Sequence, residues 1–192
     1  MKWLCVPLLL ACVPAYATKP ALVELGQLFS AADSVVVVSV DTRRAVSATF
    51  PECGTSYGAK VEESFKGQLT GVIEFGYPDG IRVGERYVLF LSKPGVPWVA
   101  LMSTNSFSEK TMAERWERCS PLQHGQRVMQ GSVGALPLRG GGPFAPKVGV
   151  KIGLGLILPQ ELRATRDSHD SSVKWVRESD LRALLHGLAQ RT

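Results

Sequence analysis

Cys53 and Cys119 are the residues of this chain whose type could most directly support covalent chemistry. A cysteine nucleophile needs a thiolate, which usually requires a neighbouring histidine and an exposed, electropositive setting. None of the three histidines lies in a sequence context typical of a cysteine protease, so we do not expect a catalytic thiol. Those histidines are His124, His169 and His186.

Two groups of charged residues raise the question of acid–base or metal chemistry. Glu62 and Glu63 are adjacent, so on a regular strand they face opposite sides and form no carboxylate pair unless a β-bulge rotates one of them. His169 lies between Asp167 and Asp170. Metal sites draw three or four ligands at helix or strand spacings, and these neighbours point apart, so we expect a solvated polar loop.

The glycine-rich motifs also fall short of a known chemistry. The run GVKIGLG at 149–155 does not fit G-x-G-x-x-G, and the chain contains no Gly-Lys-Ser/Thr of a P-loop. QGSVG at 130–134 resembles a nucleophile elbow, but Gln130 replaces the required first glycine. The sequence therefore predicts no catalytic, cofactor-binding or metal-binding residues.

The N-terminus has the features of an export signal. Lys2 precedes a short apolar stretch at 3–13, and Ala15–Ala17 form an A-x-A cleavage site. We therefore expect residues 1–17 to be a signal peptide and the mature chain to begin at Thr18. No second apolar stretch is long enough to predict a transmembrane helix.

A lipid anchor is the alternative to plain export. Leu9-Leu10-Ala11-Cys12 resembles a bacterial lipobox, which would place a lipid on Cys12, but we favour cleavage after Ala17 because a clean A-x-A site follows. Cys53 and Cys119 then remain as an even pair in an oxidising compartment, which is periplasmic or secreted. Such a pair predicts a disulfide.

Short apolar segments separated by turn residues dominate the first half of the chain. The β-branched run at 34–41 predicts a buried central strand, and 55–65 alternates until Glu62-Glu63 breaks the phase, which indicates a bulge. Closely spaced strands of this kind predict a small antiparallel barrel or sandwich. The five expected strands lie at 34–41, 55–65, 72–77, 86–92 and 98–102.

The remaining segments predict short helices and a hairpin. An amphipathic helix is expected at 20–32, and a second one, with a capping box, at 106–118. The alternating run at 147–158 predicts the second arm of a hairpin across the glycine loop 139–143. Leucines at helical spacing after Ser179 predict a C-terminal helix.

The order of these segments resembles bacterial netrin-like, or tissue-inhibitor-of-metalloproteinase-like, domains over roughly residues 30 to 120. The resemblance rests on Ala32-Asp33, on Phe65–Gly67 after the cysteine, and on the strands at 74–76 and 82–91. It implies a mostly β fold: an OB-like five-stranded antiparallel barrel with an added β-hairpin and short peripheral helices. The C-x-C start through which the animal inhibitors chelate zinc is absent, which removes the main reason to infer inhibition.

This interpretation divides the chain into three parts. We expect a signal peptide at 1–17, a barrel domain at 18–125, and a glycine-rich hairpin with the C-terminal helix at 126–192, packed on the barrel.

Charge and aromatic placement argue against nucleic acid as a partner. The net charge is +5, but Lys and Arg are scattered and no block of like charge occurs. We expect a non-catalytic cell-envelope protein whose partner is a protein or an envelope component. The alternatives are a hydrolytic enzyme of unrecognised type and a protease inhibitor that acts through a loop.

Overall fold

A computed structural model of the chain describes residues 22–77, 80–93, 114, 117–122, 125–139, 149–153, 155–167, 170 and 172–191. The predicted signal peptide, the predicted strand 98–102 and most of the predicted helix 106–118 lie outside these residues.

Five strands close into a ring. Each pairs with the next in the order β2, β3, β4, β6, β5, and β5 pairs back with β2. The predicted OB-like five-stranded barrel is therefore confirmed, with the correction that the β4–β6 pairing is parallel, so the barrel is mixed. The ring consists of β2 (Ser34–Ala45), β3 (Thr55–Lys66), β4 (Val72–Tyr77), β5 (Arg86–Ser92) and β6 (Gln126–Val128).

The fifth strand of the ring comes later in the sequence than the pattern of apolar runs predicts. β6 follows the long connection after β5, and it has only three residues, which is too short for an alternation to be visible. The ring thus reaches Val128, just beyond the boundary expected at 125.

The sheet continues beyond the ring. From β5 it adds β7 (Ala135–Arg139), β8 (Gly149–Ile152), β11 (Lys174–Val176) and β10 (Ala164–Arg166), each antiparallel to its neighbour. β7 and β8 form the predicted hairpin, but its second arm ends at Ile152 and does not continue to 158 as expected. A separate parallel pair joins β1 (Val23–Glu24) to β9 (Leu156–Ile157).

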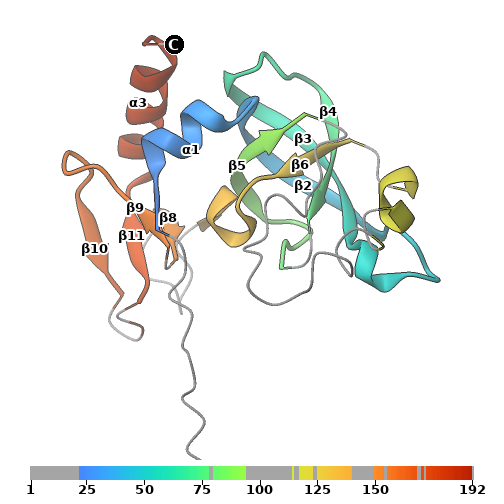
Figure 1. The fold of residues 1–192 in the computed structure, drawn as a ribbon. Coiled ribbons are helices and arrows are strands. Elements are labelled where there is room, and N and C mark those ends of the chain that lie inside the picture. Colours follow the sequence, from blue (N-terminus) through green and yellow to red (C-terminus); the bar gives the residue numbers. More distant parts are fainter. Residues whose placement is uncertain are drawn as a thin grey trace, which may run out of the picture.

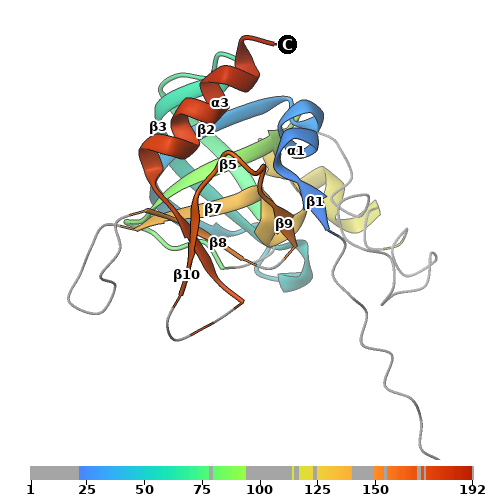
Figure 2. The ribbon, with the colours of Figure 1, turned by 90° about the vertical axis from the view of Figure 1, so that its left-hand side faces the viewer.

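Two helices cover the side of the sheet that faces away from the barrel interior (Figures 1 and 2). They are α1 (Leu25–Ala31) and α3 (Glu178–Ala189), and short 3₁₀ segments lie at Pro51–Cys53, Ser120–Leu122 and Gly131–Gly134. α1 begins later than the predicted 20–32, because Val23 and Glu24 pair with β9 instead of entering the helix.

Apolar side chains form two cores, one inside the ring and one under the helices. β2 contributes to both, because Val36 and Val38 point into the barrel and Val35 and Val37 point to the helices, all 0% exposed. The predicted buried central strand is therefore confirmed, and its unbroken valine run follows from burial on both faces. Residues of α3 in the outer core are Leu181 and Leu185.

One glycine of the β8 strand permits a close backbone approach. A Cβ atom on Gly149 would lie 2.5 Å from the carbonyl oxygen of Val176 on the neighbouring strand β11. Any other residue would therefore push β8 and β11 apart at this point.

Candidate functional site

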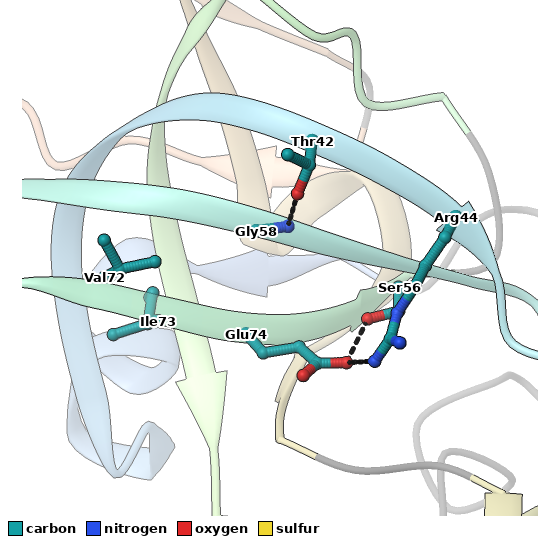
Figure 3. A pocket seen from close by; sticks show the side chains of 7 residues that line it. All are labelled: Thr42, Arg44, Ser56, Gly58, Val72, Ile73 and Glu74. Atoms are coloured by element: carbon teal, nitrogen blue, oxygen red, sulfur yellow. Dashed lines mark hydrogen bonds and ion pairs between the residues drawn. The ribbon is translucent and has the colours of Figure 1, made fainter.

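The outer face of β3 and β4 carries a shallow hollow of about 390 Å³ (Figure 3). In OB-type barrels this second-and-third-strand face, with its flanking loops, is the surface that binds ligands. β3 supplies Ser56 and Gly58, and β4 supplies Val72 and Glu74, while Ile73 between them packs against the core inside the barrel. These positions make the outer face of the two strands the candidate binding site.

Two residues of β2, Thr42 and Arg44, also line this hollow, because the register between β2 and β3 shifts by one residue. Val40 pairs with Ala59, but Thr42 pairs with Gly58, so Asp41 is an extra residue of β2. Directly opposed residues of an antiparallel pair share a face, so Thr42 lies on the outer side with Gly58. The sequence contains no recognisable signal for this bulge, and the β2 contribution to the site could not be predicted from it.

Gly58 allows the two strands to meet closely at the hollow. Its backbone N–H donates a hydrogen bond to Thr42 Oγ1 at 3.1 Å, and a Cβ at this position would lie 2.4 Å from the same oxygen (Figure 3). The threonine hydroxyl is thereby held against β3.

A polar group lines one end of the hollow. Glu74 Oε1 accepts hydrogen bonds from the guanidinium of Arg44 at 2.6 Å and from the hydroxyl of Ser56 at 2.5 Å (Figure 3). Arg44 is 69% exposed, so this ion pair contributes little to stability but presents a charged, oriented surface to a partner.

The other end of the hollow is apolar. Val72 is 77% exposed, the highest value among the exposed large hydrophobic side chains of the described residues. An apolar contact next to an oriented Arg–Glu pair offers recognition by burial and hydrogen bonding.

Arg127 lies on the same side of β4 as this hollow but is buried. It lies on β6 next to Gly76, and a Cβ on that glycine would come within 3.1 Å of the guanidinium. Arg127 is only 6% exposed, and burial lowers the pKa of its guanidinium. The glycine thus leaves room for a buried cation on the same side of β4 as Glu74.

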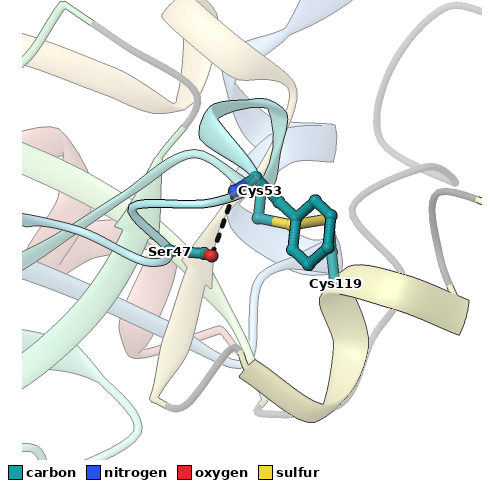
Figure 4. Close-up of a disulfide and its surroundings, with 4 residues drawn as sticks. Ser47, Cys53 and Cys119 are labelled. Atoms are coloured by element: carbon teal, nitrogen blue, oxygen red, sulfur yellow. Dashed lines mark hydrogen bonds between the residues drawn. A yellow bond between two sulfur atoms is a disulfide. The ribbon is translucent and has the colours of Figure 1, made fainter.

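The predicted disulfide lies in the loops that flank this face. Cys53 and Cys119 are bonded, with their sulfur atoms 2.01 Å apart (Figure 4). Cys53 lies in the β2–β3 connection and Cys119 in the β5–β6 connection. These are the two loops that border the ligand face of an OB-type barrel. The guanidinium of Arg118 also lies 5.1 Å from the ring centre of Phe50, a second link between the same loops.

The β-bulge that the sequence predicts at Glu62 and Glu63 is present in β3, opposite Val37 and Val38 of β2. Val37 pairs with Glu63 and Val38 with Val61, which leaves Glu62 as the extra residue. Both carboxylates then enter a chain of ion pairs between the barrel and α3.

This ion-pair chain alternates in charge along its length. Glu62 accepts three hydrogen bonds of 2.7 to 3.0 Å from the Arg86 guanidinium, and Arg86 also contacts Glu178 of α3 at 3.2 Å. These carboxylates raise the pKa of Arg86. Glu178 continues to Arg182, which pairs with Glu63, and Glu63 lies 2.8 Å from His186 Nε2. The two carboxylates therefore attach α3 to the barrel.

Asp167, Asp170 and the QGSVG run, whose residue types raise the question of chemistry, make local structural contacts or turns. Asp167 accepts a hydrogen bond from the indole of Trp175 at 2.6 Å. Asp170 accepts hydrogen bonds from the hydroxyl and backbone of Ser172, which lower its pKa. His124 and His169 lie outside the described residues. The QGSVG run forms the turn between β6 and β7, beginning at Gln130 with φ 52°.

Comparison with known proteins adds no relative to this picture. No family model matches the chain, and no curated protein is similar to it.

Within the described part of the chain, no group of three or more His, Cys, Asp or Glu side chains is arranged to hold a metal ion. No helix in the same residues is both long and apolar enough to cross a membrane.

Proposed function

We propose that this is an exported binding protein of the cell envelope, which uses the outer face of β3 and β4 to bind a protein or envelope partner. The observation that carries this proposal is the hollow on that face, where exposed Val72 lies next to the Arg44–Glu74 pair. The function is binding or structural support rather than catalysis.

The disulfide between the flanking loops supports both export and binding. Disulfides persist in oxidising compartments, which agrees with a signal peptide at 1–17. A covalent link between the β2–β3 and β5–β6 loops also limits their motion before a partner arrives. A surface that is ordered in advance loses less conformational entropy on binding.

The position of the aromatic residues favours a protein or envelope partner over an oligonucleotide. Proteins that bind single strands stack bases on outward-facing aromatic side chains. Here Phe75 of β4 and Tyr57 of β3 stack on each other inside the barrel at 5.5 Å, and both are 0% exposed. Tyr87 and Phe90 are also buried, on opposite faces of β5.

The binding face is tested by a pair of charge insertions. The mature protein, its Val72→Glu variant and the control Ile157→Glu are immobilised and exposed to a native envelope extract. Ile157 is 41% exposed on β9, outside the hollow. We expect a specific partner to be retained by the wild type and the control and to be lost with Val72→Glu. Equal retention by both variants, or no specific retention by the wild type, contradicts the proposal.

Export is tested separately by intact mass. The protein recovered from the native envelope should begin at Thr18. A mass that corresponds to a diacylated Cys12 would instead make it a membrane-anchored lipoprotein.

A further inference from the structure

We propose a second binding site, for a small oxyanion such as a phosphate or carboxylate group, on the β5–β7–β8 part of the sheet. A hollow of about 310 Å³ lies there, bounded by the turn that leads into β5 and by the hairpin strands β7 and β8. Figure 2 shows β7 and β8 lying next to β5. This hollow shares no residue with the one on β3 and β4.

Strand alternation directs two cations into this hollow. Leu138 on β7 and Val150 on β8 are buried in the outer core under the helices. Their neighbours Arg139 and Lys151 therefore point to the opposite face of the sheet, where both line the hollow. Arg82, from the turn before β5, is a third lining cation.

The carboxylate of this hollow is already engaged by other groups. Glu85 is the acidic residue among those lining the hollow. Its Oε2 accepts a hydrogen bond from the Tyr87 hydroxyl at 2.8 Å, and its Oε1 lies 3.6 Å from Arg82 Nη1. The negative charge of Glu85 thus offsets the positive charge of Arg82. The positive charges of Arg139 and Lys151 remain.

Those two remaining cations have no anionic partner within ion-pair distance in the described chain. The buried Nε of Arg139 has no hydrogen-bond acceptor, and Lys151 has only a through-space attraction with Asp170. A buried donor without an acceptor is costly, and like charges around one hollow repel each other. An oxyanion held in the hollow would offset these charges and relieve the repulsion.

The donor set selects the chemical class of the ligand. The planar guanidinium of Arg139 matches the paired oxygens of a carboxylate or phosphate, and Lys151 adds a mobile point charge. The apolar wall from Pro137 and Ile81 leaves room for a small organic group that carries the anion. Two residual positive charges favour a dianion such as phosphate over a monoanion.

The test is a titration of the mature protein with inorganic phosphate and, separately, with acetate, followed by isothermal calorimetry at low ionic strength. The variants are Arg139→Gln and Lys151→Gln, and the matched control is Arg163→Gln, an exposed arginine outside the hollow. We expect saturable binding that is tighter for phosphate. Each of the two variants should weaken it by about tenfold, and the control by less than about twofold.

Two results would overturn the site. One is the absence of saturable binding of either anion to the wild type. The other is equal weakening by Arg163→Gln, which would indicate general attraction to a basic protein. Circular dichroism of each variant confirms folding, and Lys151→Gln serves as the test if Arg139→Gln does not fold. Because Val72 is outside this hollow, Val72→Glu should leave anion binding unchanged, which separates this inference from the proposed function.

Discussion

The two hydrophobic cores of this protein share strands β2, β3, β5 and β7 but are closed by different means. The inner core, which contains Val36, Tyr57 and Leu89, is enclosed by backbone pairing around a complete ring. The outer core, which contains Val37 and Leu185, is covered by two helices that come from opposite ends of the described chain.

The interactions that hold the two regions together differ as well. A covalent bond between Cys53 and Cys119 joins the loops at the rim of the ring. α3 is held over the outer core by leucine burial and by the ion-pair chain that runs from Glu62 to His186. The barrel thus resists opening through its topology and its disulfide. The outer layer depends on side-chain contacts that salt and truncation weaken.

The largest loss of unfolding free energy is expected when the disulfide is removed. The disulfide closes a loop of 66 residues, for which the chain-entropy model gives about 4 kcal/mol. The double variant Cys53→Ser, Cys119→Ser should lose that much free energy of unfolding in urea denaturation. Reduction of the wild-type protein is the control and should give the same loss. An unchanged denaturation midpoint would show that strand pairing around the ring stabilises the barrel without help from the disulfide.

A smaller loss is expected from a cavity in the outer core. Leu185 is 0% exposed, so Leu185→Ala should lower the free energy of unfolding by about 3 kcal/mol. Leu184→Ala, at the partly buried neighbouring position, should cost less. Urea denaturation followed by both tryptophan fluorescence and circular dichroism provides the measurement. Separate transitions would show that the two cores unfold independently, and coincident ones that the shared strands couple them.

Alkaline pH should act on the inner core through Tyr87. Burial, aided by the hydrogen bond to Glu85, raises the pKa of Tyr87 to about 12. A pKa raised by folding stabilises the protein fully below the unfolded value of about 10, and this contribution is lost as pH rises through about 12. We expect a loss of about 2 kcal/mol between these values. Tyr87→Phe should lack this pH dependence, whereas ionisation near pH 10 by absorbance would contradict the prediction.

The smallest effect concerns the ion-pair chain. Arg182 links Glu178 to Glu63, and its side chain is 28% exposed. Arg182→Gln should cost about 1 kcal/mol of unfolding free energy at low salt, and less in 1 M salt because the wild-type pairs are then screened. Arg163→Gln is the matched control, with no expected loss. A cost that does not change with salt would assign the role of Arg182 to packing rather than charge.

Local patterns determined much of the architecture. The valine run of β2, the alternation of β3, the leucine spacing of α3 and the bulge at Glu62-Glu63 are all visible in the sequence, because burial and chain geometry impose a period on nearby residues. The pairing of Cys53 with Cys119 also followed from the cysteine count and the predicted compartment.

Tertiary structure alone decided which distant residues meet. No local pattern places the three-residue strand β6 in the ring or directs Arg139 and Lys151 into one hollow with Arg82. None aligns Thr42 with Gly58 or Arg44 with Ser56 either. These arrangements depend on strand pairing over long sequence separations and on a one-residue register shift at Asp41. A single shift of this kind reverses the face of every side chain that follows, so the sites become defined only when the ring has closed.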